Sequence, residues 1–184
     1  MGNNGALRHP AASFSTDRLD CRRTRPDDAA AIFSAYGTDR EVTRYLTWRP
    51  YDNFTPLIEF LHTQIDAWEQ GRGFRYEICL KGSDSPIGSI VLRPEGPKVN
   101  FGYVLAKSFW GQGLMTEALK HLVDWSLAQP EIFRAEALCD IDNPASTRVM
   151  EKAGMIREGI LRRWIVHPNI GPEPRDCLIC AKTK

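Results

Sequence analysis

A short glycine-containing segment, Trp110-Gly111-Gln112-Gly113, separates a strand-like run from a helix-like run. Apolar residues alternate from 99 to 105, which is typical of a strand, and they return at helical spacing from 113 to 127. The first turn of a helix leaves backbone N–H groups without intrahelical partners, and glycines before it let an anion approach the backbone closely. The segment therefore indicates an α/β fold with an anion site, of phosphate type, where strand passes into helix.

The spacing of this glycine turn excludes two nucleotide motifs. No Gly-Lys-Ser/Thr follows it, so it is not a Walker loop, and Thr116 stands where the dinucleotide fingerprint has its third glycine. By itself, a Gly-x-Gly turn before a helix is equally compatible with a purely structural loop. The remaining segments of the chain must decide between these alternatives.

Length and charge restrict the organisation and the partners. The 184 residues suffice for one well-filled core and show no break in composition, so we expect a tail at 1–13 and a single domain at 14–184. With 24 basic and 23 acidic residues the formal net charge is +1, which favours neither nucleic acid nor an anionic membrane as partner. No apolar run reaches about 18 residues and the N-terminus lacks a signal-peptide stretch, so we expect a cytoplasmic location.

The hydrophobic pattern predicts a mixed α/β (α+β) domain around one sheet. Turn-like connectors join the strands expected at 74–80, 87–92 and 99–105, and an antiparallel meander is the simplest joining. The other expected strands are 18–23, 133–139, 160–166 and 176–181, and the expected helices are 29–36, 55–71, 113–127 and 144–153. Asn143 is the expected cap of the last helix.

Cysteine and histidine patterns point away from metal sites and disulfides. The five cysteines are odd in number, and Cys177 and Cys180 project from opposite faces if 176–181 is a strand. The four histidines show no metal spacing and no serine elbow, so we expect no metal and no hydrolase triad.

Several segments together resemble the GCN5-related N-acetyltransferase (GNAT) superfamily, in particular the RimJ/RimL-like branch of ribosomal-protein N-terminal acetyltransferases. The resemblance covers the chain from about Phe14 onward. It rests on 101–105, on 110–119, on Asn143-Pro144-Ala145-Ser146 with Val149 and Gly154-Met155, and more loosely on Thr43-Arg44-Tyr45-Leu46 with Trp48. The resemblance implies a single, mostly antiparallel sheet that splays at the cofactor site and is flanked by helices.

The same resemblance implies acetyl-CoA as co-substrate and assigns residues to it. Its pantetheine arm would run beside Tyr103, Val104 and Leu105, with Asn143 holding an amide of the arm. The thioester oxygen would accept a hydrogen bond from the backbone of Leu105, which stabilises the oxyanion. The pyrophosphate would bind backbone N–H groups of Trp110, Gly111, Gln112, Gly113, Leu114, Met115 and Thr116.

Ser146 and Arg148 each have two interpretations. Ser146 is the expected proton donor to the departing CoA thiolate, since relatives place a serine here, but it could equally belong to the helix cap beside Asn143. Arg148 and Lys152, four residues apart on one helix face, could contact the 3′-phosphate of CoA. A solvated basic face is the more ordinary interpretation of this pair.

The general base is less defined, because Asn100 stands where relatives often carry glutamate, and an amide takes up no proton at neutral pH. Glu77 and Glu158 are the candidate substitutes, and each is more ordinary as a solvated or paired carboxylate. A chain of water molecules could also accept the proton.

The acceptor side has the weakest signal. Tyr45, Trp48 and Trp164 could line an acceptor pocket, although aromatic residues at such spacing more often belong to a core. We expect direct acetyl transfer to a primary amine, on a peptide N-terminus or a small molecule, without a covalent enzyme intermediate. The alternative is a catalytically impaired CoA-binding module, suggested by Asn100 and Ser108. A homodimer is possible if strand 176–181 pairs across subunits.

Overall fold

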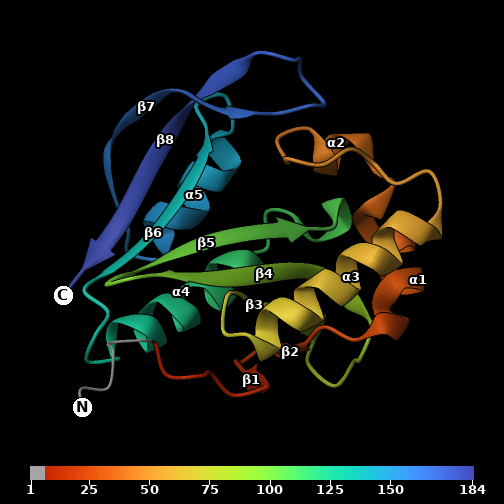
Figure 1. The fold of residues 1–184 in the computed structure, drawn as a ribbon, viewed down its shortest axis with the longest axis horizontal. Helices are drawn as coiled ribbons and strands as arrows, with labels where there is room; N and C mark the ends of the chain where they lie inside the picture. Colours follow the sequence, from red (N-terminus) through yellow and green to blue (C-terminus); the bar gives the residue numbers. More distant parts are fainter. Residues whose placement is uncertain (1–6) are drawn as a thin grey trace.

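The computed structural model describes residues 7–184, which form one eight-stranded sheet with helices on both faces (Figure 1). The strand order is β1-β2-β3-β4-β5-β6-β8-β7. The strands are β1 Ser13–Ser15, β2 Leu19–Arg23, β3 Phe74–Leu80, β4 Pro86–Glu95, β5 Lys98–Leu105, β6 Arg134–Asp140, β7 Ile156–Val166 and β8 Pro174–Thr183. The helices are α1 Ala29–Ile32, α2 Arg40–Thr43, α3 Phe54–Glu69, α4 Leu114–Leu127 and α5 Pro144–Lys152.

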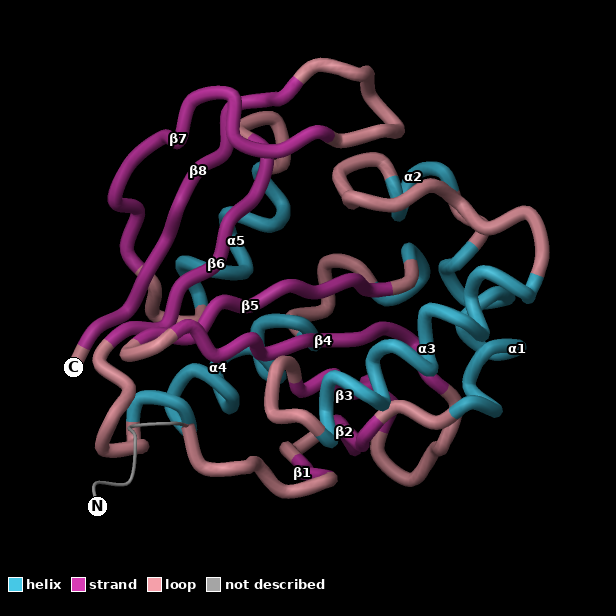
Figure 2. Tube along the Cα trace, viewed as in Figure 1, coloured by secondary structure: helices cyan, strands magenta, loops and turns pink. Residues whose placement is uncertain are grey.

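The mixed α/β class with a mostly antiparallel sheet is confirmed, and so is the meander, because β2 through β5 pair antiparallel in chain order. The one parallel pairing, between β5 and β6, is short and runs from Lys98 opposite Arg134 to Phe101 opposite Ala137. Beyond that point β6 continues alongside β8 and leaves β5 (Figure 2). The second half of β5, from Gly102 to Leu105, is therefore hydrogen-bonded on one side only, to β4.

Two apolar clusters hold the helices against the sheet. Side chains alternate along a strand, so each strand contributes to both faces. One face packs against α4, with Ile90 and Phe101 beside Leu119. The other packs against α1 and α3 through a smaller cluster that includes Leu61 and Val104. Val104, in the splayed half of β5, is thus part of the smaller cluster.

The helix limits follow local capping. Asn143 accepts a hydrogen bond from the Ser146 N–H and caps α5, as predicted. Helix α3 begins at Phe54, before the expected start, because the Asn53 side chain is its cap. Helical spacing of Leu57, Ile58 and Leu61 predicts that all three lie in the apolar stripe of this helix, but Ile58 is 38% exposed, so the stripe is narrower. The pattern gave no signal for the short elements β1 and α2.

The C-terminal strand corrects one expectation. Strand β8 lies between β6 and β7 and pairs with both, so segment 176–181 has no free edge for pairing across subunits. The expected tail divides into two parts: residues 1–6 lie outside the described residues, whereas Leu7 is buried and His9 packs on Phe74. Within 7–184, no helix has the length and apolar character needed to cross a membrane.

Candidate active site

Two adjoining cavities follow the unpaired half of β5. The larger has a volume of about 460 Å³ and extends to the loop before α4; the smaller has about 280 Å³ and lies over the β3–β4–β5 face of the sheet. Both are lined by Tyr45, Leu46, Tyr103, Val104, Asn143 and Ser146. The splay of the sheet therefore opens a passage between two chambers, with β5 and the start of α5 at their junction.

Backbone groups shape the end of the larger cavity near α4. Gly111 and Gly113 have φ values of 75° and 78°, in the left-handed region that side chains disfavour. Gly113 is the N-cap of α4, so the N–H groups of the following first turn, at Leu114, Met115 and Thr116, have no intrahelical acceptor. The loop presents these donors at the cavity wall, as an anion site requires.

Arg18, which lies far from this loop in the sequence, anchors the loop together with Glu117. Arg18 donates from Nη1 to the Gln112 carbonyl at 2.9 Å and from Nε to Glu117 Oε2 at 2.7 Å. Burial opposes ionisation of Glu117, but hydrogen bonds from Thr16 and Arg18 prevail and lower its pKa. The sequence gave no signal for this role of Arg18, because its partners lie 94 and 99 residues away.

Of the residues assigned to the cofactor, Gln112 alone is absent from the cavity wall. Its side chain turns back and donates to the Ser108 carbonyl at 3.0 Å. Tyr103, Val104, Leu105, Asn143, Ser146 and Arg148 line the cavity together with the other loop and helix positions. Gln112 thus stiffens the loop.

The exposed side of β5 offers backbone donors as well. Ala106 donates to the Ile87 carbonyl of β4 at 2.8 Å, and alternation in an antiparallel pair directs the N–H groups of Tyr103 and Leu105 to the opposite side. The indole Nε1 of Trp110 donates to the Leu105 carbonyl at 2.7 Å on that side. The carbonyl is thus occupied, while the Leu105 N–H faces the space that β6 has left.

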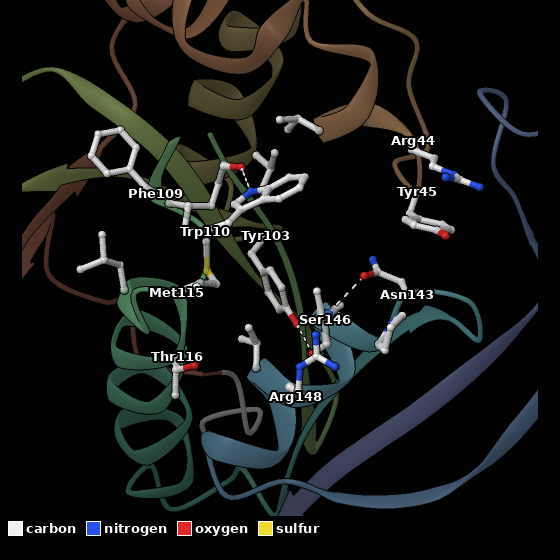
Figure 3. Close-up of a pocket in the computed structure, with 18 of the residues that line it drawn as sticks. Arg44, Tyr45, Tyr103, Phe109, Trp110, Met115, Thr116, Asn143, Ser146 and Arg148 are labelled. Carbon is white, nitrogen blue, oxygen red and sulfur yellow. Dashed lines mark hydrogen bonds between the residues drawn. The ribbon is translucent and has the colours of Figure 1, made fainter. Parts of the chain in front are cut away.

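Tyr103 and Ser146 form a pair of hydroxyl groups at the junction of the cavities (Figure 3). Their oxygens lie 2.7 Å apart, and Tyr103 Oη also donates to the Ser146 carbonyl at 3.2 Å. Burial raises the pKa of Tyr103 well above its ordinary value, so the phenol keeps its proton. Because the cap acceptor is the Asn143 side chain, the Ser146 hydroxyl is not used by the cap and pairs with Tyr103 at the wall of both cavities.

Three cationic side chains line the larger cavity. Arg148 and Lys152 lie there on the exposed face of α5, and Arg44 lies across from them in the segment after α2 (Figure 3). Arg148 and Lys152 therefore line the same cavity as the glycine turn. In the described residues, neither has an ion-pair partner within 4.0 Å.

The segment after α2 borders the smaller cavity, and the connection between β7 and β8 is hydrogen-bonded to it. Asn169, in the β7–β8 connection, donates from Nδ2 to the carbonyls of Thr43 and Trp48 at 2.7 and 2.8 Å. Tyr45 and Trp48 line this cavity, as expected for acceptor-side residues. Trp164 is 58% exposed and lines neither cavity.

His167 lines the smaller cavity. The sequence gave no role to this residue, because the histidines lack the spacing of metal ligands. It is only 3% exposed, and its Nε2 lies 3.5 Å from Asp140 Oδ2. Burial lowers its pKa more than the Asp140 carboxylate raises it. The imidazole is therefore neutral at pH 7. Its position in the β7–β8 connection could not be inferred before the fold was known.

The two carboxylates considered as bases lie outside both cavities. Glu77 is fully buried and accepts from Arg75 Nε at 2.7 Å and from Thr24 Oγ1 at 2.8 Å. Glu158 accepts from Arg134 Nη1 at 3.0 Å. Asn100, in contrast, lines the smaller cavity. Each glutamate is thus engaged in an ion pair away from the splay.

Potential metal ligands do not gather in the described residues. Within 7–184, no group of three His, Cys, Asp or Glu side chains could hold a metal ion. All five cysteines are buried free thiols. Burial raises the pKa of Cys180 to about 11, so this thiol stays protonated at neutral pH.

Comparison with known proteins matches this geometry to a family. A model of the acetyltransferase (GNAT) domain matches residues 18–156. An uncharacterized N-acetyltransferase of Bacillus subtilis, YoaA, is 29% identical over 155 residues, which are 83% of this chain and 87% of that protein. The ribosomal-protein-serine acetyltransferase of Escherichia coli is 32% identical over 95 residues, 50% of this chain and 53% of that protein. The solved microcin C7 self-immunity acetyltransferase MccE, in complex with acetyl-CoA and AMP, has a TM-score of 0.85 at 16% identity and covers 96% of this chain and 98% of its own.

The chain belongs to the GNAT acetyltransferase family. It is an acetyl-CoA-dependent acyltransferase, as its N-acetyltransferase relatives indicate. The RimJ/RimL-like resemblance is confirmed.

Proposed function

We propose that this chain moves the acetyl group of acetyl-CoA directly to a primary amine, with the donor in the larger cavity and the acceptor in the smaller one. The supporting observation is the junction itself. Two cavities of different wall chemistry meet at Tyr103, Val104 and Ser146, beside the outward N–H of Leu105. Such a junction lets two substrates enter from opposite sides and meet without a covalent enzyme intermediate.

Acetyl-CoA supplies an activated thioester, and this chain's residues supply positioning and proton donors. The N–H groups of Gly111 to Thr116 bind its pyrophosphate, and Arg148 with Lys152 binds a further phosphate. The N–H of Trp110, which the sequence also assigned to the pyrophosphate, instead donates to the Lys107 carbonyl at 3.1 Å. Asn143 retains its Nδ2 as a donor for the pantetheine arm while Oδ1 caps α5. The Leu105 N–H stabilises the developing oxyanion, since its direction is fixed before substrate binds.

The transfer forms a nitrogen–carbon bond and breaks a carbon–sulfur bond, so one proton leaves the amine and the thiolate gains one. Ser146 donates to the sulfur and recovers a proton from water, which takes up the proton that the amine loses. Tyr103 keeps its own proton and orients the Ser146 hydroxyl through the 2.7 Å contact between their oxygens. No carboxylate among the described residues lines the smaller cavity. The amine therefore enters as the free base, or gives its proton to water or to neutral His167.

The competing proposal is a module that binds CoA without turnover, motivated by Asn100 in place of a glutamate. Both proposals place CoA in the larger cavity. They differ in whether an amine in the smaller cavity is acetylated. A test must therefore separate binding from transfer.

The experiment measures the unfolding midpoint with acetyl-CoA and then the release of free CoA with a panel of amines and N-terminal peptides. Acetyl-CoA at 100 times its dissociation constant should add about 2.7 kcal/mol, which is a shift of several degrees for a chain of this size. Release of CoA must depend on the acceptor. Stabilisation without acceptor-dependent release would support the impaired module, and no stabilisation at saturating ligand would contradict both proposals.

A further inference from the structure

The smaller cavity carries an excess of positive charge that the transfer reaction itself does not need. Its charged lining residues are two arginines, Arg75 and Arg93, and among the described residues it has no Asp or Glu in its wall. A pocket built only to admit an ammonium group would carry the opposite charge, since cations repel an amine in its protonated form.

Arg75 retains donors that the protein does not use. Its Nε donates to Glu77 at 2.7 Å and its Nη2 to Tyr36 Oη at 3.3 Å, while its guanidinium lies over the ring of Phe60. Nη1 has no hydrogen-bond acceptor among residues 7–184. Although burial opposes it, Glu77 keeps the pKa of Arg75 above its ordinary value. The side chain is 10% exposed, so these spare donors can face the cavity.

Arg93 is a residue of β4, and its side chain lies beside the start of the unpaired half of β5. A Cβ atom at Gly102 would lie 3.1 Å from Arg93 Nη1, so the guanidinium covers the backbone at this glycine. Within the described part of the chain, the guanidinium of Arg93 makes no hydrogen bond and no ion pair with protein groups, although its backbone pairs with β5. Burial, together with the neighbouring Arg75, lowers its pKa.

Glu77 neutralises Arg75, whereas two further carboxylates of this sheet region pair with other cations. Glu95 pairs with Lys98 at 3.2 Å, and Glu136 is held by Lys98 at 2.6 Å and also by Arg134. Arg93 therefore brings one positive charge that the described protein groups do not neutralise. Guanidinium groups with free N–H donors are suited to bind carboxylate or phosphate oxygens.

We propose that Arg93 and Arg75 form an anion-binding subsite of the acceptor, so that the amine substrate carries an anionic group several bonds away from its nitrogen. This inference rests on the proposed transfer function. Gly102 and Leu105 are three residues apart on β5, which is roughly 10 Å. The Arg93 guanidinium beside Gly102 and the N–H group of Leu105 are thus separated by a span that suits a glutamate-like acceptor.

The cavity volume favours a small acceptor. This cavity has about 280 Å³, against about 460 Å³ for the larger one. An amino acid, or the first residue of a peptide, fits this space. The anionic group can thus belong to a free acidic amino acid or to an acidic first side chain of a peptide.

The test compares acceptors that differ only in this group. L-glutamate against L-glutamine represents the free amino acid, and Glu-Ala-amide against Gln-Ala-amide represents the peptide. We expect kcat/KM to be about tenfold or more higher for the acidic member of at least one pair. The pair that discriminates identifies the source of the anion, and equal values in both pairs would overturn the proposal.

Variants assign the preference to the subsite. Arg93→Gln should abolish the preference for the acidic acceptor and leave the KM for acetyl-CoA unchanged, whereas Arg93→Lys should retain part of it. Arg72→Gln is the matched control, because Arg72 is exposed and lines neither cavity. Its side chain donates to Gln70. An equal loss for acidic and neutral acceptors in Arg93→Gln would contradict the proposal.

A binding measurement separates this inference from the transfer function. Calorimetry with CoA present compares N-acetyl-L-glutamate and N-acetyl-L-glutamine, which are the products of the first pair. Tighter binding of the acid that Arg93→Gln removes would support the subsite even if no amine releases CoA. Equal binding of the two products by a protein that does turn over would overturn the subsite alone.

Discussion

The two cavities are built by different means, although they share a strand. The larger one presents backbone N–H groups from a glycine turn, a helix N-terminus and a splayed strand end. The smaller one presents side chains from β3, β4, β5, the segment after α2 and the β7–β8 connection. A backbone-made site fixes one ligand for a whole family, whereas a side-chain-made site can change its ligand by substitution. The comparison explains why the fold defines the donor and leaves the acceptor to each protein.

The largest effect is expected at the junction. Ser146→Ala removes the proposed proton donor and should lower kcat about 100-fold, in the range of general acid catalysis, with acetyl-CoA affinity unchanged. Steady-state release of CoA measures kcat, and calorimetry measures the affinity. Ser34→Ala, an exposed serine outside both cavities, is the control. A variant with wild-type turnover would remove Ser146 from the mechanism.

The glycine turn tests the backbone-made site. Gly111→Ala forces a side chain into φ 75°, which costs ~1–2 kcal/mol, and should weaken acetyl-CoA binding roughly tenfold as the loop relaxes. Gly82→Ala is matched, because its φ is 76°, its added Cβ also meets no atom within 4 Å, and it lies in the β3–β4 turn. Both variants should lose similar stability in urea unfolding. Equal acetyl-CoA affinities in the two variants would contradict a backbone-made site.

Replacing Arg18 tests whether the glycine turn needs the hydrogen bonds that Arg18 donates to it. Arg18→Ala removes the hydrogen bonds to Gln112 and Glu117 and should weaken acetyl-CoA binding about threefold, because the loop loses order while its donors remain. Arg25→Ala removes an exposed ion pair with Asp84 far from the turn and serves as control. Identical affinities for wild type and Arg18→Ala would show that the glycines suffice.

The smallest effect concerns pH and the wall of the smaller cavity. The unfolded chain protonates His167 near the ordinary pKa of 6.5, but burial lowers that pKa in the folded chain despite Asp140, and Arg175 lowers it further. Below pH 6.5 the unfolded state binds more protons, so stability decreases as the pH falls toward the folded pKa. His167→Gln should flatten this decrease in urea unfolding between pH 7 and 5.

The half-buried imidazole of His121 adds to the wild-type slope, since partial burial lowers its pKa as well. His62→Gln, at an exposed position of α3, should keep the full slope. If His167→Gln and His62→Gln showed the same pH dependence, the neutral imidazole in the cavity wall would be contradicted.

Much of the fold and the donor side was predictable from sequence, because these depend on local patterns. The meander, the α5 cap at Asn143 and the glycine turn follow from alternation, capping preference and turn chemistry. Arg18 was not predictable as an anchor, since nothing local relates it to residues almost a hundred positions away.

The acceptor side depends on strand register and on distant segments. Arg93 reaches the cavity because Gly102 offers no side chain in the next strand, and His167 reaches it because the β7–β8 connection folds over the segment after α2. Neither relation has a sequence motif. Glu77 was considered as a base because it is a carboxylate on a neighbouring strand, but Arg75 stands between it and the cavity.

In the proposed function, backbone donors of β5 and the α4 turn hold the acetyl donor while side chains select the acceptor. An NMR titration of the ¹⁵N-labelled protein with acetyl-CoA tests it most directly. We predict that the largest amide shifts occur at Tyr103, Leu105 and residues 111–116, with the Arg75 and Arg93 guanidinium signals moving only when an acidic acceptor or product is added. Amide shifts that avoid these two segments, or guanidinium signals that respond to acetyl-CoA alone, would contradict the account.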